Sequence, residues 1–185
     1  MGYQATVREQ LKDMANVWAP TENGGNSKNV LAHLDEWVVS RAPDLVHVNC
    51  GLHDIIRAAG RNQPAVSLEE YTTNVRTILN RLQAETKAIV VWVATTPVNE
   101  KRHREVRQFD RLEVDVVAYN ATATRVAGEL KVRVHDLFGA ILPTERDVLL
   151  GPDGVHFTPA GYAFLGKRVA DCIRSCLAAA NPVGK

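Results

Sequence analysis

The sequence predicts an α/β domain in which helices cover a parallel β-sheet. Segments whose apolar residues recur every three or four positions alternate with short runs of β-branched residues, which is the pattern of βαβ units. The chain has 185 residues, close to the usual size of one domain, and no repeat or low-complexity linker divides it. We therefore expect a single domain over residues 1–185.

The individual elements follow from the same periodicity. Five segments have apolar residues at helical spacing and are expected as helices: 3–14, 31–38, 68–82, 112–126 and 159–180. Four short apolar runs are expected as strands: 17–19, 45–49, 88–94 and 132–134. Ser67 with Glu70 forms a capping box that opens the third helix, and Thr158 followed by Pro159 marks the start of the last one. The charged stretch 100–107 is expected to be a solvated loop.

The composition excludes several classes of protein. The 22 lysine and arginine residues nearly balance 21 aspartate and glutamate residues, so the chain lacks the basic charge typical of nucleic-acid-binding proteins. Hydrophobic residues make up 45% of the chain, which is too many for a disordered protein. The longest apolar run, 88–94, is far shorter than the ~20 residues of a membrane-spanning helix. We expect a soluble, cytoplasmic domain without a membrane span or a nucleic-acid partner, and any export signal would lie upstream of Met1.

One strand that a parallel α/β sheet would normally have is absent from the expected elements. A helix that packs on a parallel sheet normally connects two strands of that sheet, yet no strand precedes the helix expected at 3–14. We therefore expect the sheet to lack its first strand.

The residues that follow each strand are the candidates for chemistry, because open α/β sheets bind ligands beyond the carboxyl ends of their strands. Asp153 and His156 have the spacing D-x-x-H, in which one tight turn can place the carboxylate on the imidazole Nδ1–H and leave Nε2 as a general base. The same spacing also suits a capped turn with a surface histidine.

Two further positions suit the binding of a developing oxyanion. Gly25, in the sequence NGGNS at 23–27, would place a backbone N–H against it, and His53 would donate from its ring. Each has a purely structural alternative. The glycines also suit a plain turn before a helix capped by Asn26 or Ser27, and His53 also suits a hydrogen bond to local backbone.

A metal site and a disulfide framework have less support. Four residues beyond the strand ends could supply nitrogen and oxygen ligands, but no H-x-H or H-E-x-x-H spacing joins them: His53, Asp54, Asp153 and His156. The three cysteines have neither metal-knuckle nor disulfide spacing and are expected as core thiols: Cys50, Cys172 and Cys176.

Three of these segments together resemble one protein family. Residues 153–162 (DGVHFTPAGY), 23–27 (NGGNS) and 51–54 (GLHD) are similar to three sequence blocks of the SGNH or GDSL-type hydrolases, which are esterases, lipases and acylhydrolases. The third segment departs from the family because His53 stands where a side-chain amide is usual. The resemblance implies a flavodoxin-like, three-layer α/β/α sheet.

The resemblance also implies a reaction. A serine would attack the carbonyl of a small-molecule ester, His156 would take and return the proton, Asp153 would orient His156, and Gly25 with His53 would hold the oxyanion. No metal or organic cofactor is implied. We therefore expect a serine-type carboxylic ester hydrolase that works through an acyl-enzyme.

The family's fourth block, the Gly-Asp-Ser turn that carries the nucleophile, does not occur in the sequence. In the family this turn follows the first strand, and Met1-Gly2-Tyr3 resembles its end. We expect the domain to be N-terminally truncated and inactive as it stands, with the serine encoded about three residues before Met1.

In a 2-1-3-4-5 sheet the first strand lies between two others. Its loss would remove about ten backbone hydrogen bonds at ~1 kcal/mol each, which rivals the stability of a whole domain. The chain alone is expected to be unstable, to close the gap, or to recruit a strand from another molecule.

Two alternatives come from other classes of function. The first is a non-catalytic module that binds an acylated sugar or lipid, since Ser27 is the only serine near any block and is expected to cap a helix. The second, a phosphate-binding module, lacks a G-x-G-x-x-G or Walker pattern. Ester turnover by a form extended upstream would separate an enzyme from a binding module.

Overall fold

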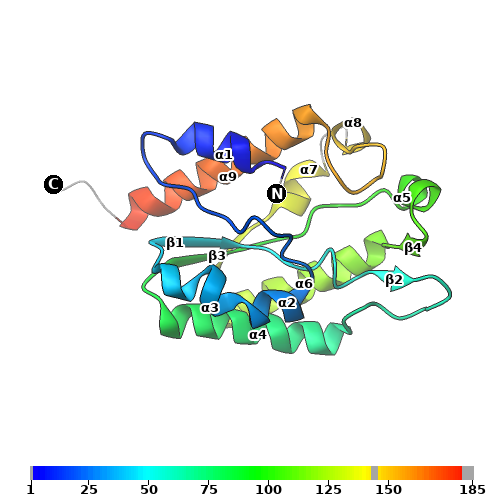
Figure 1. Ribbon diagram of the computed structural model, residues 1–185, viewed down its shortest axis with the longest axis horizontal. Helices are drawn as coiled ribbons and strands as arrows, with labels where there is room; N and C mark the ends of the chain where they lie inside the picture. Colours follow the sequence, from blue (N-terminus) through cyan, green and yellow to red (C-terminus); the bar gives the residue numbers. More distant parts are fainter. Residues whose placement is uncertain (1, 143–145, 181–185) are drawn as a thin grey trace.

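The computed structural model describes residues 2–142 and 146–180 and has an α/β fold (Figure 1). Three parallel strands form the main sheet in the order β1–β3–β5: β1 (Leu45–Val48), β3 (Ile89–Val93) and β5 (Arg133–His135). The expected α/β class and parallel sheet are confirmed. Strand β3 has a neighbour on both sides, whereas β1 is an edge strand.

Helices cover both faces of this sheet (Figure 1). One face carries α1 (Gln4–Leu11), α7 (Leu137–Ile141) and α9 (Pro159–Ala180). The other carries α2 (Ser27–Ala32), α3 (Leu34–Trp37), the 3₁₀ turn η1 (Val39–Arg41), α4 (Leu68–Glu85) and α6 (Glu113–Glu129). The short helix α8 (Arg146–Leu149) contacts α9, and the short helix α5 (Glu100–Val106) lies against β4 (Phe109–Asp110). An antiparallel ribbon of β2 (Arg57–Ala58) and β4 (Phe109–Asp110) completes the fold.

Alternation along the central strand divides the core in two. Val90 and Trp92 of β3 pack with α4 and α6, and Trp92 is only 1% exposed. Val91 and Val93 point to the opposite face, where Val93 packs with α1 and α9. Because successive side chains of a strand alternate between faces, the continuous apolar run 88–94 identifies a strand that is buried on both sides.

The expected starts of two long helices are confirmed. The Ser67 hydroxyl accepts a hydrogen bond from the backbone N–H of Glu70 at 3.1 Å at the start of α4. The Thr158 hydroxyl accepts one from Gly161 at 3.2 Å, and α9 begins at Pro159. Both caps satisfy backbone donors that have no partner inside the helix. The start of α9 fixes the turn that carries Asp153 and His156.

Three expectations about local structure are wrong. Residues 17–19 form no strand, because no neighbouring strand pairs with their backbone and a cavity separates them from the edge of β1. The helix expected at 31–38 is interrupted at His33, which ends α2 and precedes α3. The stretch 100–107 is not a loop but contains α5, because Asn99 caps it and Glu100 pairs with Arg104 one turn on.

The cysteines behave as core residues, as expected. Cys50, Cys172 and Cys176 are all buried and are free thiols.

Among the described residues, none of the helices has the length and hydropathy needed to cross a membrane. Met1, which belongs to the segment that resembles the end of the nucleophile block, lies outside the described residues.

Candidate active site

Asp153 and His156 lie in the turn that leads into α9. His156 Nδ1 is 2.5 Å from Asp153 Oδ2, and the His156 backbone N–H donates to Asp153 Oδ1 at 2.9 Å. Burial opposes ionisation of Asp153, but the hydrogen bonds from His156 and Val155 outweigh it and lower the pKa of the carboxyl to about 2. The ionised carboxylate favours the tautomer of His156 with its proton on Nδ1, which leaves Nε2 as an acceptor. The hydrogen bond expected between Asp153 and His156 is therefore present.

Backbone contacts hold this turn in place. Gly154 has a φ of +69°, and its carbonyl accepts a hydrogen bond from the N–H of Asn99 at 2.7 Å. A Cβ at Gly154 would lie 2.3 Å from the Asn99 carbonyl oxygen, so a larger residue would push the turn away from α5. The Gly151 N–H donates to the His156 carbonyl at 2.6 Å. One backbone hydrogen bond therefore ties the turn to Asn99, and another closes it from within.

His103 of α5 supports the same turn through a contact with its backbone. Its Nδ1 lies 3.2 Å from the carbonyl oxygen of Asp153, and its side chain is almost fully buried beside the Phe109 ring. Burial lowers the pKa of His103, so the ring is neutral and donates from Nδ1. Sequence reasoning missed His103 because it lies in the segment expected to be a loop. The helix cap at Asn99 was the signal that could have placed it on a helix.

His53 lies in the turn after β1. Gly51 begins this turn with a φ of +143°, and the Tyr71 hydroxyl holds the preceding carbonyl of Cys50 at 3.0 Å. The half-buried His53 ring makes no hydrogen bond with the described residues. Burial lowers its pKa, and the nearby charges of Arg111 and His156 lower it further. At neutral pH the ring therefore carries one N–H, which is available to a ligand.

Arg111 is a second site residue that sequence reasoning missed. Its side chain is 7% exposed, and its Nε donates to the Leu52 carbonyl at 2.8 Å. Burial and the charge of Arg107 lower its pKa to about 10, and the Asp153 carboxylate opposes this shift. The guanidinium remains charged at neutral pH and fixes the turn that carries His53. No spacing in the sequence pointed to it.

Gly25 reaches the same region, but its N–H is already occupied. The residue has a φ of +65°, and its N–H donates to the side-chain oxygen of Asn23 at 2.9 Å. The Asn29 amide donates to the Gly24 carbonyl at 2.9 Å and fixes the loop from the other side. An oxyanion would have to replace the Asn23 oxygen as the acceptor of the Gly25 N–H.

Ser27 and Asp54 are joined beneath these two loops. Ser27 is fully buried, and its hydroxyl donates to Asp54 Oδ1 at 2.5 Å and accepts from the Asn74 amide at 3.0 Å. The cap of α2 is Asn26, whose side chain accepts from the N–H of Asn29 at 3.1 Å. Ser27 thus has no path to a substrate. Asp54, also fully buried, faces Ser27 rather than the other residues weighed as metal ligands.

One cavity of about 830 Å³ brings the candidate residues together. Gly25, His53 and His156 all line it, as do the residues of β1 and the loop that contains Trp18. None of the four serines of the sequence lines this cavity: Ser27, Ser40, Ser67 and Ser175. Within the described residues, the His156 ring hydrogen-bonds to Asp153 through Nδ1, and no serine hydroxyl donates to its Nε2. The site thus combines a base, its orienting carboxylate and a ring N–H donor.

Comparison with known proteins adds to this geometry. Residues 2–164 match the sequence model of the GDSL-like Lipase/Acylhydrolase family. A lipase/acylhydrolase from Enterococcus faecalis superposes with a TM-score of 0.74 at 21% identity, over 94% of this chain and 85% of that chain. A GDSL-like lipase from Bacteroides thetaiotaomicron superposes with a TM-score of 0.75 at 20% identity, over 95% and 83% of the two chains.

An acetylxylan esterase from Geobacillus stearothermophilus has a TM-score of 0.72 at 21% identity, over 92% of this chain and 80% of that chain. A search of curated proteins by sequence gave no match. The structural likenesses show a shared fold, and the family match covers most of the chain. The chain belongs to the GDSL-like lipase/acylhydrolase (SGNH) family of ester hydrolases.

Proposed function

We propose that this domain supplies the histidine–aspartate pair and the substrate cavity of a serine-type carboxylic ester hydrolase. The observation that carries the proposal is the 2.5 Å contact between His156 Nδ1 and Asp153 Oδ2, with the imidazole at the wall of the cavity. A partly buried carboxylate that fixes the tautomer of an accessible imidazole is an arrangement that activates a hydroxyl nucleophile.

The reaction then proceeds in two acyl-transfer steps. His156 Nε2 takes the proton of the serine hydroxyl as the oxygen attacks the ester carbonyl, and the carbonyl oxygen becomes an oxyanion. The His53 ring donates to this oxyanion, and the Gly25 N–H joins it when it leaves the Asn23 oxygen. The intermediate collapses, and His156 gives the proton to the departing alcohol. Water, activated by the same ring, then releases the acid and restores the serine.

We further propose that a strand beside β1 carries the serine. The cavity borders the whole of β1, because residues 43–53 line it without a break, and residues 18–20 line it as well. The backbone groups of β1 that do not pair with β3 have no strand partner in the described part of the chain. A parallel strand paired there would end near His53, because the carboxyl ends of parallel strands lie at the same edge. A serine just after it would face His156.

The test compares two forms of the protein. One is the 185-residue chain, and the other is a longer form in which a short β-branched strand and a Gly-Asp-Ser turn precede Met1. The substrate is p-nitrophenyl acetate, chosen because one similar structure is an acetylxylan esterase. We expect the longer form to turn over the ester and the 185-residue chain to remain at the background of free imidazole.

Matched variants separate catalysis from folding. His156→Ala in the longer form should abolish turnover, and Asp153→Asn should lower kcat by roughly 10⁴-fold while the far-ultraviolet circular dichroism is unchanged. Turnover by the 185-residue chain that Ser27→Ala abolishes would overturn the placement of the serine. A folded longer form without turnover would overturn the enzymatic proposal.

A binding module for an acylated sugar or lipid is the second candidate. It is favoured by one observation, that no serine lines the cavity among the described residues. Such a module would hold an acylated sugar intact. Nuclear magnetic resonance of an acetylated xylo-oligosaccharide with the longer form distinguishes the two, because an enzyme releases acetate and a binding module only broadens the ligand signals.

A further inference from the structure

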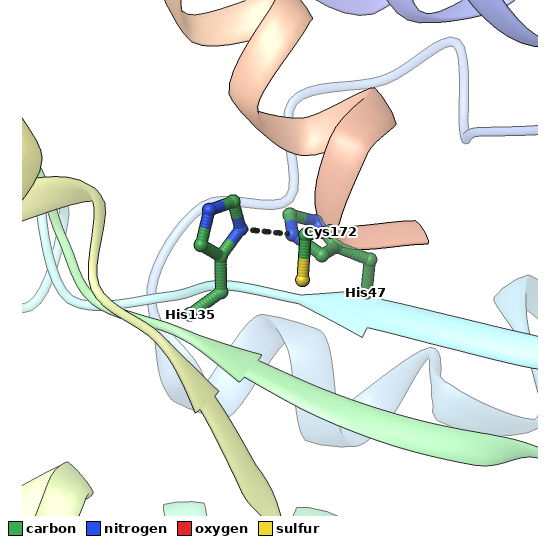
Figure 2. Close-up of side chains that lie close together, drawn as sticks. All are labelled: His47, His135 and Cys172. Atoms are coloured by element: carbon green, nitrogen blue, oxygen red, sulfur yellow. Dashed lines mark hydrogen bonds between the residues drawn. The ribbon is translucent and has the colours of Figure 1, made fainter. Parts of the chain in front are cut away.

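Two histidines and a cysteine meet on the α9 side of the sheet, apart from the Asp153–His156 pair (Figure 2). His47 comes from β1, His135 from β5 and Cys172 from α9. His47 Nε2 lies 3.0 Å from His135 Nδ1, and one ring nitrogen of each histidine and the Sγ of Cys172 all lie within 4.8 Å of one another. None of these side chains has a role in the proposed ester hydrolysis.

The separations suit a tetrahedral metal ion with little rearrangement. Two imidazole nitrogens on one zinc ion, each at ~2.0–2.1 Å, lie about 3.3 Å apart. The two nitrogens of this cluster are already 3.0 Å apart, and the Cys172 side chain lies close to both rings (Figure 2). A set of two imidazoles and one thiolate binds borderline transition metals such as zinc in preference to magnesium or calcium.

The surroundings of the cluster supply both access and neutral ligands. His47 lines the cavity beside β1, which gives an ion a path from solvent. Burial and the charge of His135 lower the pKa of His47 to about 3, so its ring is neutral at pH 7. Arg133 and Arg168 lie near His135 and disfavour a cation, whereas Asp136 favours one. A thiolate ligand reduces the charge of a bound Zn²⁺ to +1 and so limits the repulsion by the two arginines.

We propose that His47, His135 and Cys172 form a binding site for a zinc-like divalent ion that ties β1 to β5 and α9. The fourth coordination position takes water. Each neutral ring keeps one proton, held on His47 Nδ1 and on His135 Nε2, so that the two facing nitrogens both offer lone pairs. The Cys172 thiol releases its proton to solvent when the Zn–S bond forms. The site is independent of ester hydrolysis, and its function is to hold β1, β5 and α9 together.

The test uses the full 185-residue chain, held under reducing conditions so that the cysteines stay free, with Co²⁺ as a spectroscopic probe and Zn²⁺ as a competitor. We expect one equivalent of Co²⁺ to give the ultraviolet thiolate charge-transfer band and the intense visible bands of a tetrahedral site. One equivalent of Zn²⁺ should remove both. Calorimetry in two buffers of different ionisation enthalpy should show the release of one proton for each Zn²⁺ ion.

The chain offers a matched control for the thiol. Cys176 lies one helical turn after Cys172, is also a buried free thiol, and hydrogen-bonds to Cys172 without being one of the three proposed ligands, so that a serine at position 176 keeps a hydroxyl for this contact. Cys172→Ser should abolish the charge-transfer band and weaken Zn²⁺ binding by at least 100-fold, whereas Cys176→Ser should leave both unchanged. His47→Gln should weaken binding to a similar degree without removing the thiol.

The histidines of the candidate active site provide a second control. If Co²⁺ were held by His53 and His156 instead, His156→Ala would remove its visible bands and Cys172→Ser would not. The proposal is overturned by that result, by equal Zn²⁺ affinity in the wild-type chain and in Cys172→Ser, or by the absence of saturable Co²⁺ binding to the folded wild-type chain. If Cys172→Ser does not fold, His47→Gln and the Co²⁺ charge-transfer band of the wild-type chain decide the matter.

Discussion

The carboxylate of Asp54 accepts two hydrogen bonds from Ser27, one from the backbone N–H at 2.9 Å and one from the hydroxyl at 2.5 Å. Both residues are fully buried. Asp54 directly follows His53, and Ser27 lies two positions after Gly25, so this contact joins the two loops that carry the candidate oxyanion donors. Ser27 therefore links the two loops structurally and is not a nucleophile.

We expect Ser27→Ala to lower the free energy of unfolding by ~1–3 kcal/mol, because the buried Asn74 amide loses its Ser27 acceptor and Asp54 Oδ1 loses the hydroxyl donor, keeping only the backbone N–H. Ser40→Ala is the control, since Ser40 is exposed and should change stability by less than about 0.5 kcal/mol. Urea unfolding followed by circular dichroism measures both. Equal stability of the two variants would show that the buried network contributes nothing.

Much of the fold could be predicted from the sequence because the local signals agree with the final packing. The apolar run 88–94 and the cap at Ser67 are set by neighbours in the chain, and both lie where they were expected. The prediction of a strand at 17–19 was wrong because a strand needs a neighbouring strand to pair with, and the residues of the run do not determine whether one is present. The prediction of a loop at 100–107 was wrong because it relied on the charge of the segment and did not use the helix cap at Asn99.

The candidate site divides in the same way. Asp153 and His156 are three residues apart, so spacing alone could predict their contact. The Asp54–Ser27 contact and the His47–His135–Cys172 cluster join residues that are far apart in the chain, and only the three-dimensional fold brings them together. His103 and Arg111 were missed for the same reason, since each contacts the site through a backbone carbonyl of a distant turn.

The low pKa of Asp153 predicts a pH dependence of stability. The carboxyl has a pKa of about 2 in the folded chain, below its ordinary value of 3.8. A depressed pKa contributes stability that is present above pH ~4 and is lost as the pH falls towards 2. The stability difference between the wild-type chain and Asp153→Asn should therefore shrink between pH 5 and pH 2, as measured by thermal unfolding at each pH.

Asp13→Asn provides the reference for that experiment. Asp13 is exposed and makes no hydrogen bond or ion pair with the described residues, so its replacement should change the melting temperature little. A difference for Asp153→Asn that stays constant from pH 5 to pH 2 would contradict the assignment of the low pKa to the His156 contact.

His53 should contribute to the transition state through its ring N–H. In the longer, serine-bearing form, His53→Ala is expected to lower kcat by roughly 10²–10³-fold with little change in KM, because the donor acts on the oxyanion rather than on the bound ester. His53→Asn restores a side-chain N–H donor and should recover most of this loss. Equal activity of His53→Ala and the parent enzyme would show that the ring does not face the oxyanion.

The unpaired edge of β1 should be visible by hydrogen exchange. In the 185-residue chain, the β1 amides that do not bond to β3 should exchange quickly, whereas the amides of β3, which has a strand on both sides, should be protected. Addition of the serine-bearing strand should protect the β1 amides and raise the Tm, because each new backbone hydrogen bond contributes ~1 kcal/mol and each kcal/mol raises the Tm by about 2–4 °C.

Strand β5 is the internal control, because it is the other edge of the sheet and the added strand does not reach it. Its exchange rates should be the same in both forms, which excludes a general stabilisation as the cause of any change at β1. If the β1 amides were already protected to the level of β3 in the 185-residue chain, another segment would occupy the edge of β1. The cavity would then have no room for a serine-bearing strand, and the proposed position of the nucleophile would have to be abandoned.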